Sequence, residues 1–281
     1  MATLFDHAFA RLDHAEARHE EFGSAWAAYI SRHPWGAELR VVSDQLFEII
    51  VRCHEPAPAS MSLAFSDWLA ALRAALDNGL YAWAAAVTGQ DPPPDAAKLQ
   101  FPIATTPTEF RQQARRLASL PGDIVSNLEK AQPYQSRYGP ESNLLYWLHE
   151  LARVDRHRRL HLGLGQVAEH HVQVGVPAGV DVRFDEDVEP YAPIDAELVI
   201  ARFTTSEAVD PADIEFNPAI GIDPEIKVWA PFRLGGQRQS LKIRMGMTQL
   251  FVRNHLENMA MFSGTMPPGG FRTFGLEQAA P

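Results

Sequence analysis

The stretch PESNLLYWLHELARVDRHRRLHL, Pro140–Leu162, predicts a helix with one apolar side and a densely charged end. Its apolar residues recur at steps of three and four, the period of a helix with one buried side. They are Leu144, Leu145, Leu148, Leu151 and Ala152. The last turns carry Arg153, Asp155, Arg156, His157, Arg158, Arg159 and His161. A helix dipole favours each cation there by about 0.3–1 kcal/mol, which explains a bias but not a cluster. This charged block is therefore the leading candidate site.

The chain before this stretch also has helical periodicity. Apolar residues at helical spacing predict long helices over residues 4–31 and from about residue 60 to 87. Thr106-Pro107-Thr108-Glu109 has the order of a capping box with proline at the first helical position. It predicts a helix from there to about Leu120, followed by a shorter one to about Gln132. β-Branched residues predict a hairpin over residues 37–53.

After Leu162 the period changes from helical to two, which is typical of strands. We expect strands at Gln166–Val176, Val180–Val188, Glu197–Phe203, Ile214–Phe216 and Glu225–Trp229, and a closing helix at Thr248–Phe262. Helices followed by strands predict an α+β fold, an N-terminal helical bundle with a small hairpin packed on an antiparallel β-rich region. The expected domains are 1–162 with hairpin 37–53, then 163–264 with the final helix, then a flexible tail over 265–281.

Composition limits the classes of function. The chain has 281 residues and a formal net charge of −10, which argues against broad, nonspecific nucleic-acid binding but not against a local basic site. The single cysteine, Cys53, is flanked by apolar strand residues and is read as a core residue, not a nucleophile. No signal peptide or membrane-spanning apolar run is visible, so we expect a cytoplasmic protein that does not insert into membranes.

Four stretches resemble a widespread bacterial family of uncharacterised proteins with helix motifs L-R-x-A-L-D and D-[KR]-H-R-x-L-H. They are Ser62–Ala84, Leu99–Ile103, Ala131–Tyr134 and Leu144–Leu162. The chain departs from the family pattern at Ala71, Asn78 and Arg156, where the family tends to carry Asn, His and Lys. The resemblance covers the first 162 residues, and in the rest of the chain it extends only to a strand-rich character.

The resemblance implies that Arg73 and Asp77 of one helix meet the DRHR segment of another. We expect Arg73 to contact Asp155, and Asp77 to contact a cation among Arg156, His157 and Arg158. Such a cluster suits a binding protein for RNA or another phosphate-bearing ligand. It equally suits a buried ion-pair network that only fixes the register of two helices, and both readings stay open.

An enzymatic alternative starts from Arg156 and His161, whose spacing resembles the R-x4-6-H motif of HEPN-type helical ribonucleases. That resemblance implies a homodimer with a shared site and no metal or other cofactor. His161 would act as general acid or base and Arg156 would stabilise charge on the phosphate. Residues five apart on a straight helix point about 140° apart, so the helix would have to end or bend between them.

A third reading is a metal site at His157 and His161, which stand one turn apart with His149 upstream and His170-His171 downstream. The arginines beside His157 would repel a cation, and the spacing fixes no acidic ligand. This reading is therefore the weakest of the three.

Overall fold

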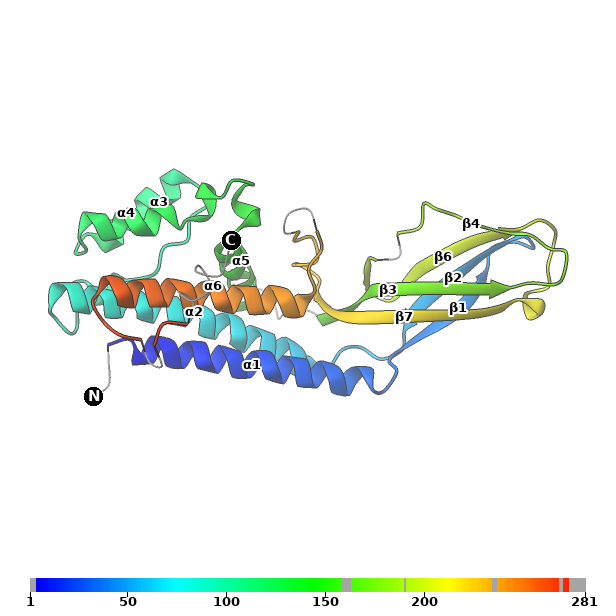
Figure 1. Ribbon diagram of the computed structural model, residues 1–281, viewed down its shortest axis with the longest axis horizontal. Helices are drawn as coiled ribbons and strands as arrows, with labels where there is room; N and C mark the ends of the chain where they lie inside the picture. The colour runs from blue at the N-terminus through cyan, green and yellow to red at the C-terminus, as the bar shows by residue number, and fades with distance from the viewer. Residues whose placement is uncertain (1–3, 158–162, 190, 234–236, 268–269, 273–281) are drawn as a thin grey trace. The chain divides into compact units, whose positions relative to one another are not determined.

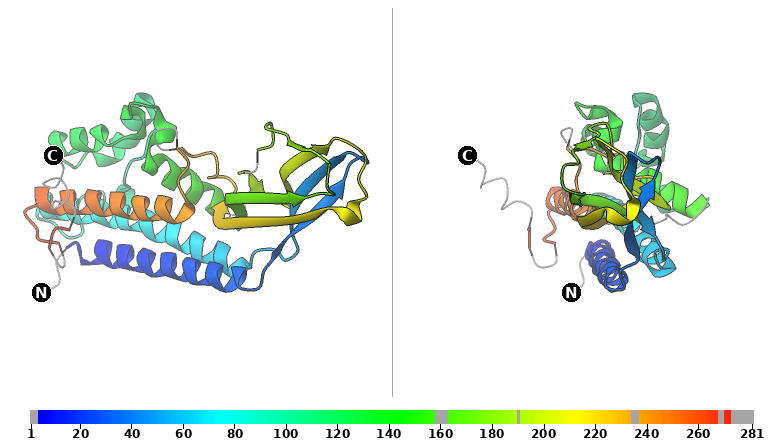
Figure 2. Two further views of the ribbon diagram at one scale, coloured as in Figure 1. Left: turned by 45° about the vertical axis from the view of Figure 1, so that its right-hand side comes forward. Right: turned by 90° about the vertical axis from the view of Figure 1, so that its right-hand side faces the viewer.

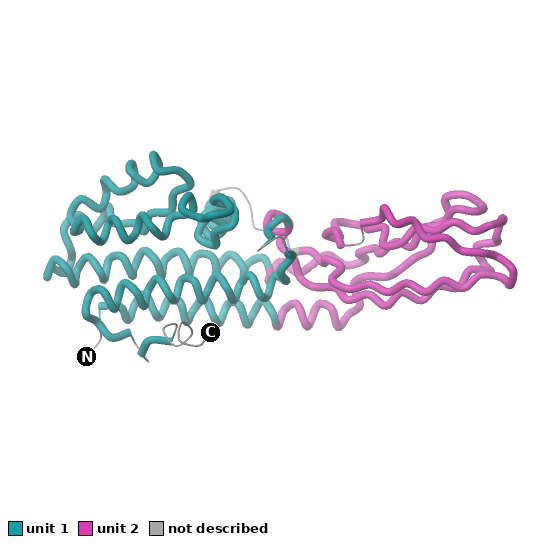
Figure 3. Tube along the Cα trace, turned by 45° about the horizontal axis from the view of Figure 1, so that its top comes forward, with its two compact units in different colours: residues 1–23, 62–161, 231–281 teal, residues 24–61, 162–230 magenta. Residues whose placement is uncertain are grey.

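The computed structural model describes residues 4–157, 163–189, 191–233, 237–267 and 270–272. The fold is α+β, which confirms the predicted class (Figure 1). Two compact units share the chain: unit 1 comprises residues 1–23, 62–161 and 231–281, and unit 2 comprises residues 24–61 and 162–230 (Figure 3). Each unit is therefore built from segments that are far apart in the sequence.

Three long helices form the body of unit 1 (Figures 1 and 2). They are α1 (Asp6–Ile30, whose last residues belong to unit 2), α2 (Ala59–Thr88) and α6 (Leu241–Phe262). His19 Nδ1 of α1 lies 2.6 Å from Gln249 Oε1 of α6. A Cβ at Gly79 of α2 would overlap Cδ2 of Leu256 on α6, so glycine allows these two helices to approach closely.

The shorter helices of unit 1 are α3 (Pro107–Ala114), α4 (Gly122–Lys130) and α5 (Leu144–His157). The predicted capping box is confirmed, because the Thr106 hydroxyl accepts a hydrogen bond from Glu109 N at 3.1 Å. The Glu109 carboxylate in turn accepts from Thr105 N at 2.8 Å. The central helix begins at Leu144, after a 3-10 turn at Pro140–Ser142.

Two antiparallel sheets form unit 2. One has the order β1-β2-β6-β4, with β1 (Trp35–Val41), β2 (Leu46–Cys53), β6 (Glu197–Thr205) and β4 (Val182–Phe184). The other has the order β5-β3-β7, with β5 (Pro193–Ile194), β3 (Gly163–Gly175) and β7 (Glu215–Ile226). The hairpin that we expected with the helical bundle thus pairs, through β2, with β6 from the C-terminal half.

The core of unit 2 lies between the two sheets. Phe47 and Phe203 of the first sheet are fully buried with Val167 of the second. Two predicted strands overlap the single strand β7: Ile214–Phe216 falls at its beginning, whereas only Glu225 and Ile226 of the predicted Glu225–Trp229 belong to it, because residues 227–229 form a turn. That strand contains Pro218 and Pro224, which a sheet tolerates at its edge, where β7 lies.

The closing helix begins seven residues before the predicted Thr248, where the Ser240 hydroxyl accepts a hydrogen bond from Ile243 N at 3.3 Å. Gly246 in its second turn weakens the helical pattern that the sequence offers there. Most of the tail predicted over residues 265–281 lies outside the described residues. Among the helices that the structure describes, none is long and apolar enough to cross a bilayer.

Candidate functional site

Arg73 and Asp77, one turn apart on α2, hold the backbone of Phe101. Arg73 Nη2 donates to the Phe101 carbonyl at 2.6 Å, and Phe101 N donates to Asp77 Oδ1 at 2.8 Å. The same guanidinium nitrogen lies 3.1 Å from Asp77 Oδ1. An ion pair on one helix thus supplies both hydrogen bonds that a neighbouring strand would otherwise give to this peptide.

Two glutamines continue this arrangement along the extended segment Leu99–Ala104. The Gln113 side chain of α3 accepts from Ile103 N at 3.0 Å and donates to the Ile103 carbonyl at 2.8 Å. Gln132 accepts from Ala104 N at 2.8 Å and donates to the Pro102 carbonyl at 3.0 Å. The two short motifs of the resemblance, residues 99–103 and 131–134, therefore belong to one structural unit.

The contacts of helix α5 with α2 differ from those predicted for Asp155 and Arg156. Asp155 accepts a hydrogen bond from the Ser66 hydroxyl of α2 at 2.5 Å, so the expected contact between Arg73 and Asp155 is replaced by one with a neutral partner. Ser66 precedes Arg73 by two turns of α2, which places Asp155 too far along the helix to pair with the arginine. Arg156 is exposed, and its Nε donates to the carbonyl of Ala152 at 3.2 Å.

Charge and burial link Arg73, Asp77, His149 and Arg156, which we call the α2–α5 cluster. Burial lowers the pKa of Arg73; Asp77 opposes that shift and Arg156 adds to it. Burial raises the pKa of Asp77 against the opposing charges of Arg73 and Arg156. Burial also lowers the pKa of His149, and both arginines contribute in the same direction. Arg156 therefore lies close enough to influence the other three groups.

Several polar atoms of the cluster have no hydrogen-bond partner among the described residues. They are Arg73 Nε, Arg73 Nη1 and His149 Nδ1, and all three are buried. Arg73 as a whole is 5% exposed. A buried donor without an acceptor costs about 1–3 kcal/mol, more if it is charged, so the cluster lacks acceptors for its donors.

His149 belongs to the α2–α5 cluster, although the sequence did not lead us to predict it there. The sequence reading named His149 only as an upstream neighbour of a metal pair. His149, Arg153 and Arg156 stand at i, i+4 and i+7, so they share one side of α5. This spacing was the signal that would have linked His149 to Arg156.

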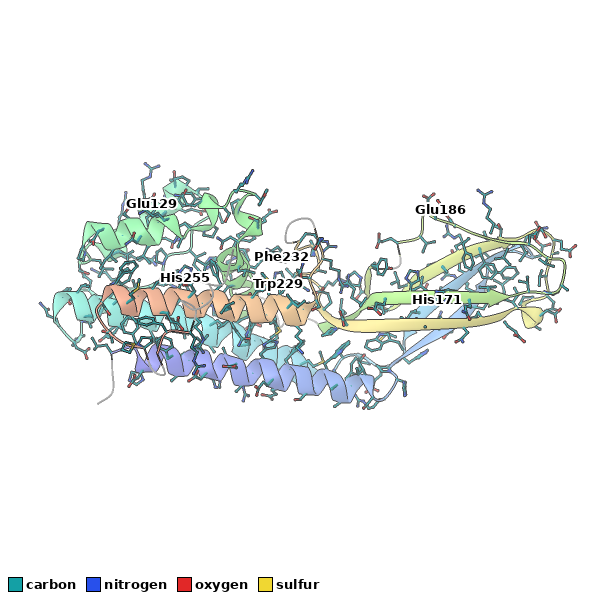
Figure 4. The ribbon with its side chains drawn as sticks, in the orientation of Figure 1. Glu129, His171, Glu186, Trp229, Phe232 and His255 are labelled. Atoms are coloured by element: carbon teal, nitrogen blue, oxygen red, sulfur yellow. The ribbon has the colours of Figure 1, made fainter. Side chains whose placement is uncertain are left out.

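His255 of α6, labelled in Figure 4, contacts Phe101 of the segment that the cluster holds. Its ring centroid is 5.8 Å from that of Phe101 and 4.7 Å from that of Phe251. Its Nε2 is buried without a hydrogen-bond partner, and burial lowers the pKa of His255 to about 4. His255 is thus a neutral packing residue at ordinary pH, and no sequence motif pointed to it.

Three predicted site residues cannot be placed. Arg158 and His161 lie outside the described residues, as does the side chain of His157. The Arg156–His161 pair of the ribonuclease reading and the His157–His161 pair of the metal reading therefore stay predictions. Within the described ranges, no group of three or more His, Cys, Asp or Glu side chains is arranged to hold a metal ion.

Comparisons with protein-family models, curated proteins and solved structures found no match to this chain. The family resemblance noted from the helix motifs thus also stays a prediction. The case for function rests on the geometry of the chain itself.

Proposed function

We propose that this chain binds a phosphate-bearing ligand at the α2–α5 cluster. The observation that carries the proposal is the pair of guanidinium groups, Arg73 and Arg156. Among the described residues, two buried nitrogens of Arg73 have no acceptor, and the exposed Arg156 has a backbone carbonyl as its one hydrogen-bond partner. Guanidinium groups bind phosphate oxygens through paired, charge-assisted hydrogen bonds.

A purely structural role explains part of this cluster but not all of it. Holding Phe101 accounts for Nη2 of Arg73 and for Asp77. It does not account for Arg156, which raises the local positive charge and lowers the pKa of both Arg73 and His149. The charges of two guanidinium groups act on one carboxylate, Asp77, which already pairs with Arg73 and accepts from Phe101 N, so a bound oxyanion would balance the charge.

The test compares Arg156→Gln with Arg115→Gln, a control that removes an exposed arginine elsewhere in unit 1. Binding of a fluorescent single-stranded RNA oligonucleotide and of pyrophosphate is measured by anisotropy and by calorimetry. We expect Arg156→Gln to weaken binding of at least one probe by about tenfold or more, a loss of about 1.4 kcal/mol. Equal affinities for the two variants, or no binding by the parent protein, would refute the proposal. Whether RNA or only pyrophosphate binds identifies the ligand class.

RNA cleavage is a second candidate, supported by the opposite pKa shifts in this cluster. The pKa of Asp77 is raised and that of His149 is lowered, and burial is the main cause of both. Groups shifted in this way beside arginines suit acid–base chemistry on a phosphodiester without a metal. The parent protein, His149→Gln and His161→Ala would be incubated with a labelled RNA. Cleavage that survives both substitutions would exclude an imidazole mechanism at either position.

A further inference from the structure

A groove between α1 and α2 is separate from the cluster described above. Its volume is about 860 Å³, within the range of small-molecule sites. It is lined by Leu4, His7, Ala10, Arg11, His14, Asn78, Tyr81 and Asp91. All of these residues belong to unit 1, and none of them belongs to the α2–α5 cluster.

The α1 wall presents three basic side chains on one side of the helix. His7, Arg11 and His14 stand at i, i+4 and i+7, so successive members are neighbours on the helix surface. All three are exposed, and none has a hydrogen bond or ion pair with another described residue. Arg11 is thus a cation at the groove without a described ion-pair partner, and the imidazoles of His7 and His14 beside it can donate hydrogen bonds.

The opposite wall is polar: α2 contributes Asn78 and Tyr81, and the segment after α2 contributes Asp91. Asn78 is half-buried and offers an amide that both donates and accepts. The Tyr81 hydroxyl donates to Asp91 Oδ1 at 2.9 Å. Asp91, the one carboxylate among the described lining residues, accepts from this neutral hydroxyl and forms no described ion pair with Arg11.

We propose that this groove binds a polar small molecule that carries a compact oxyanion, a phosphate or a carboxylate. Arg11 binds the oxyanion between His7 and His14, and Asn78 with the Tyr81–Asp91 pair binds hydroxyl groups of the ligand. A shared metal ion does not fit, because His7 and His14 are about 10 Å apart along the helix at 1.5 Å per residue. The inference is independent of the proposed function, since the two sites share no residue.

Three ligands of similar size separate the sources of the oxyanion. Glucose 6-phosphate carries a phosphate, gluconate carries a carboxylate, and glucose carries neither. Their binding to the full chain is measured by calorimetry, and changes in the histidine side-chain NMR signals report where they bind. We expect saturable binding of glucose 6-phosphate or gluconate, at least about tenfold tighter than that of glucose.

The variants assign the binding to one site. Arg11→Gln should weaken binding of the charged probe by about tenfold or more, whereas Arg115→Gln and Arg156→Gln should leave it unchanged. Asn78→Asp, which adds a negative charge to the opposite wall, should weaken it as well. Absence of saturable binding by both charged probes, or equal affinities for Arg11→Gln and Arg115→Gln, would overturn the inference. Loss of binding in Arg156→Gln alone would also overturn it, and would at the same time support the α2–α5 cluster.

Discussion

Acid should destabilise this protein through His255, and replacing that residue with phenylalanine should remove the effect. The imidazole of this α6 residue packs against the rings of Phe101 and Phe251, and burial lowers its pKa to about 4 from an ordinary value of 6.5. Above pH 6.5 the side chain is neutral in the folded and the unfolded protein, so it makes no pH-dependent contribution. As the pH falls below 6.5, the unfolded chain takes up a proton that the folded chain refuses.

The size of the effect follows from the two pKa values. Their difference corresponds to about 3 kcal/mol, lost progressively between pH 6.5 and about pH 4 and constant below that. The free energy of unfolding of an ordinary domain is about 5–15 kcal/mol, so the loss of about 3 kcal/mol at His255 is a large share of it. His255→Phe keeps an aromatic ring against Phe101 and Phe251, and at neutral pH it should change stability by less than about 1.5 kcal/mol.

The assay is urea unfolding followed by far-UV circular dichroism, which reports mainly on the helices of unit 1. The free energy of unfolding is compared for the parent protein and His255→Phe at several pH values from about pH 7.5 to about pH 4. His171→Phe introduces the same ring at an exposed position of β3 and controls for the added phenyl group. We expect the parent and the control to lose stability in parallel and His255→Phe to lose about 3 kcal/mol less. Identical pH profiles for the parent and His255→Phe would show that the imidazole is not buried as a neutral group.

Three further predictions concern the ion pairs and the helix packing. Arg73→Met should lower the free energy of unfolding, measured in urea, by about 3–5 kcal/mol. The double variant Arg73→Met with Asp77→Leu should lose less stability than the sum of the two single variants. Strictly additive losses would contradict a coupled pair. Burial of Glu48 opposes its ionisation, but hydrogen bonds from two arginines outweigh burial and lower its pKa. Glu48→Gln should therefore lower the free energy of unfolding by about 1.5–3 kcal/mol at neutral pH. The difference in stability between parent and variant should vanish as acid protonates the parent carboxylate below pH 4.5. Gly79→Ala should lower the melting temperature because the new methyl group overlaps α6, whereas Gly246→Ala, where a Cβ meets no atom within 4 Å, should raise it; the opposite order would refute the close packing.

Local signals in the sequence identified much of the fold because their causes are local. The hydroxyl of Thr106 and the carboxylate of Glu109 lie within one turn of the amides that they cap, so the start of α3 could be read directly. The sequence also predicted the end of the closing helix at Phe262. It did not predict the start, because Gly246 interrupts the helical pattern in the turns that follow the cap at Ser240. The continuity of β7 through two prolines depends on that strand lying at a sheet edge, which no local pattern reveals.

By itself the sequence determined the α+β class, the main helices and the placement of Arg73 and Asp77 one turn apart on one helix, because periodicity and residue spacing are properties of short stretches. Tertiary structure decided which groups these polar side chains contact. Arg73 binds the backbone of Phe101, 28 positions along the chain, and Asp155 binds Ser66 instead of Arg73. It also decided that the pKa values of His149 and His255 are lowered, because desolvation depends on which distant segments cover a side chain, and that information exists only once the chain has folded.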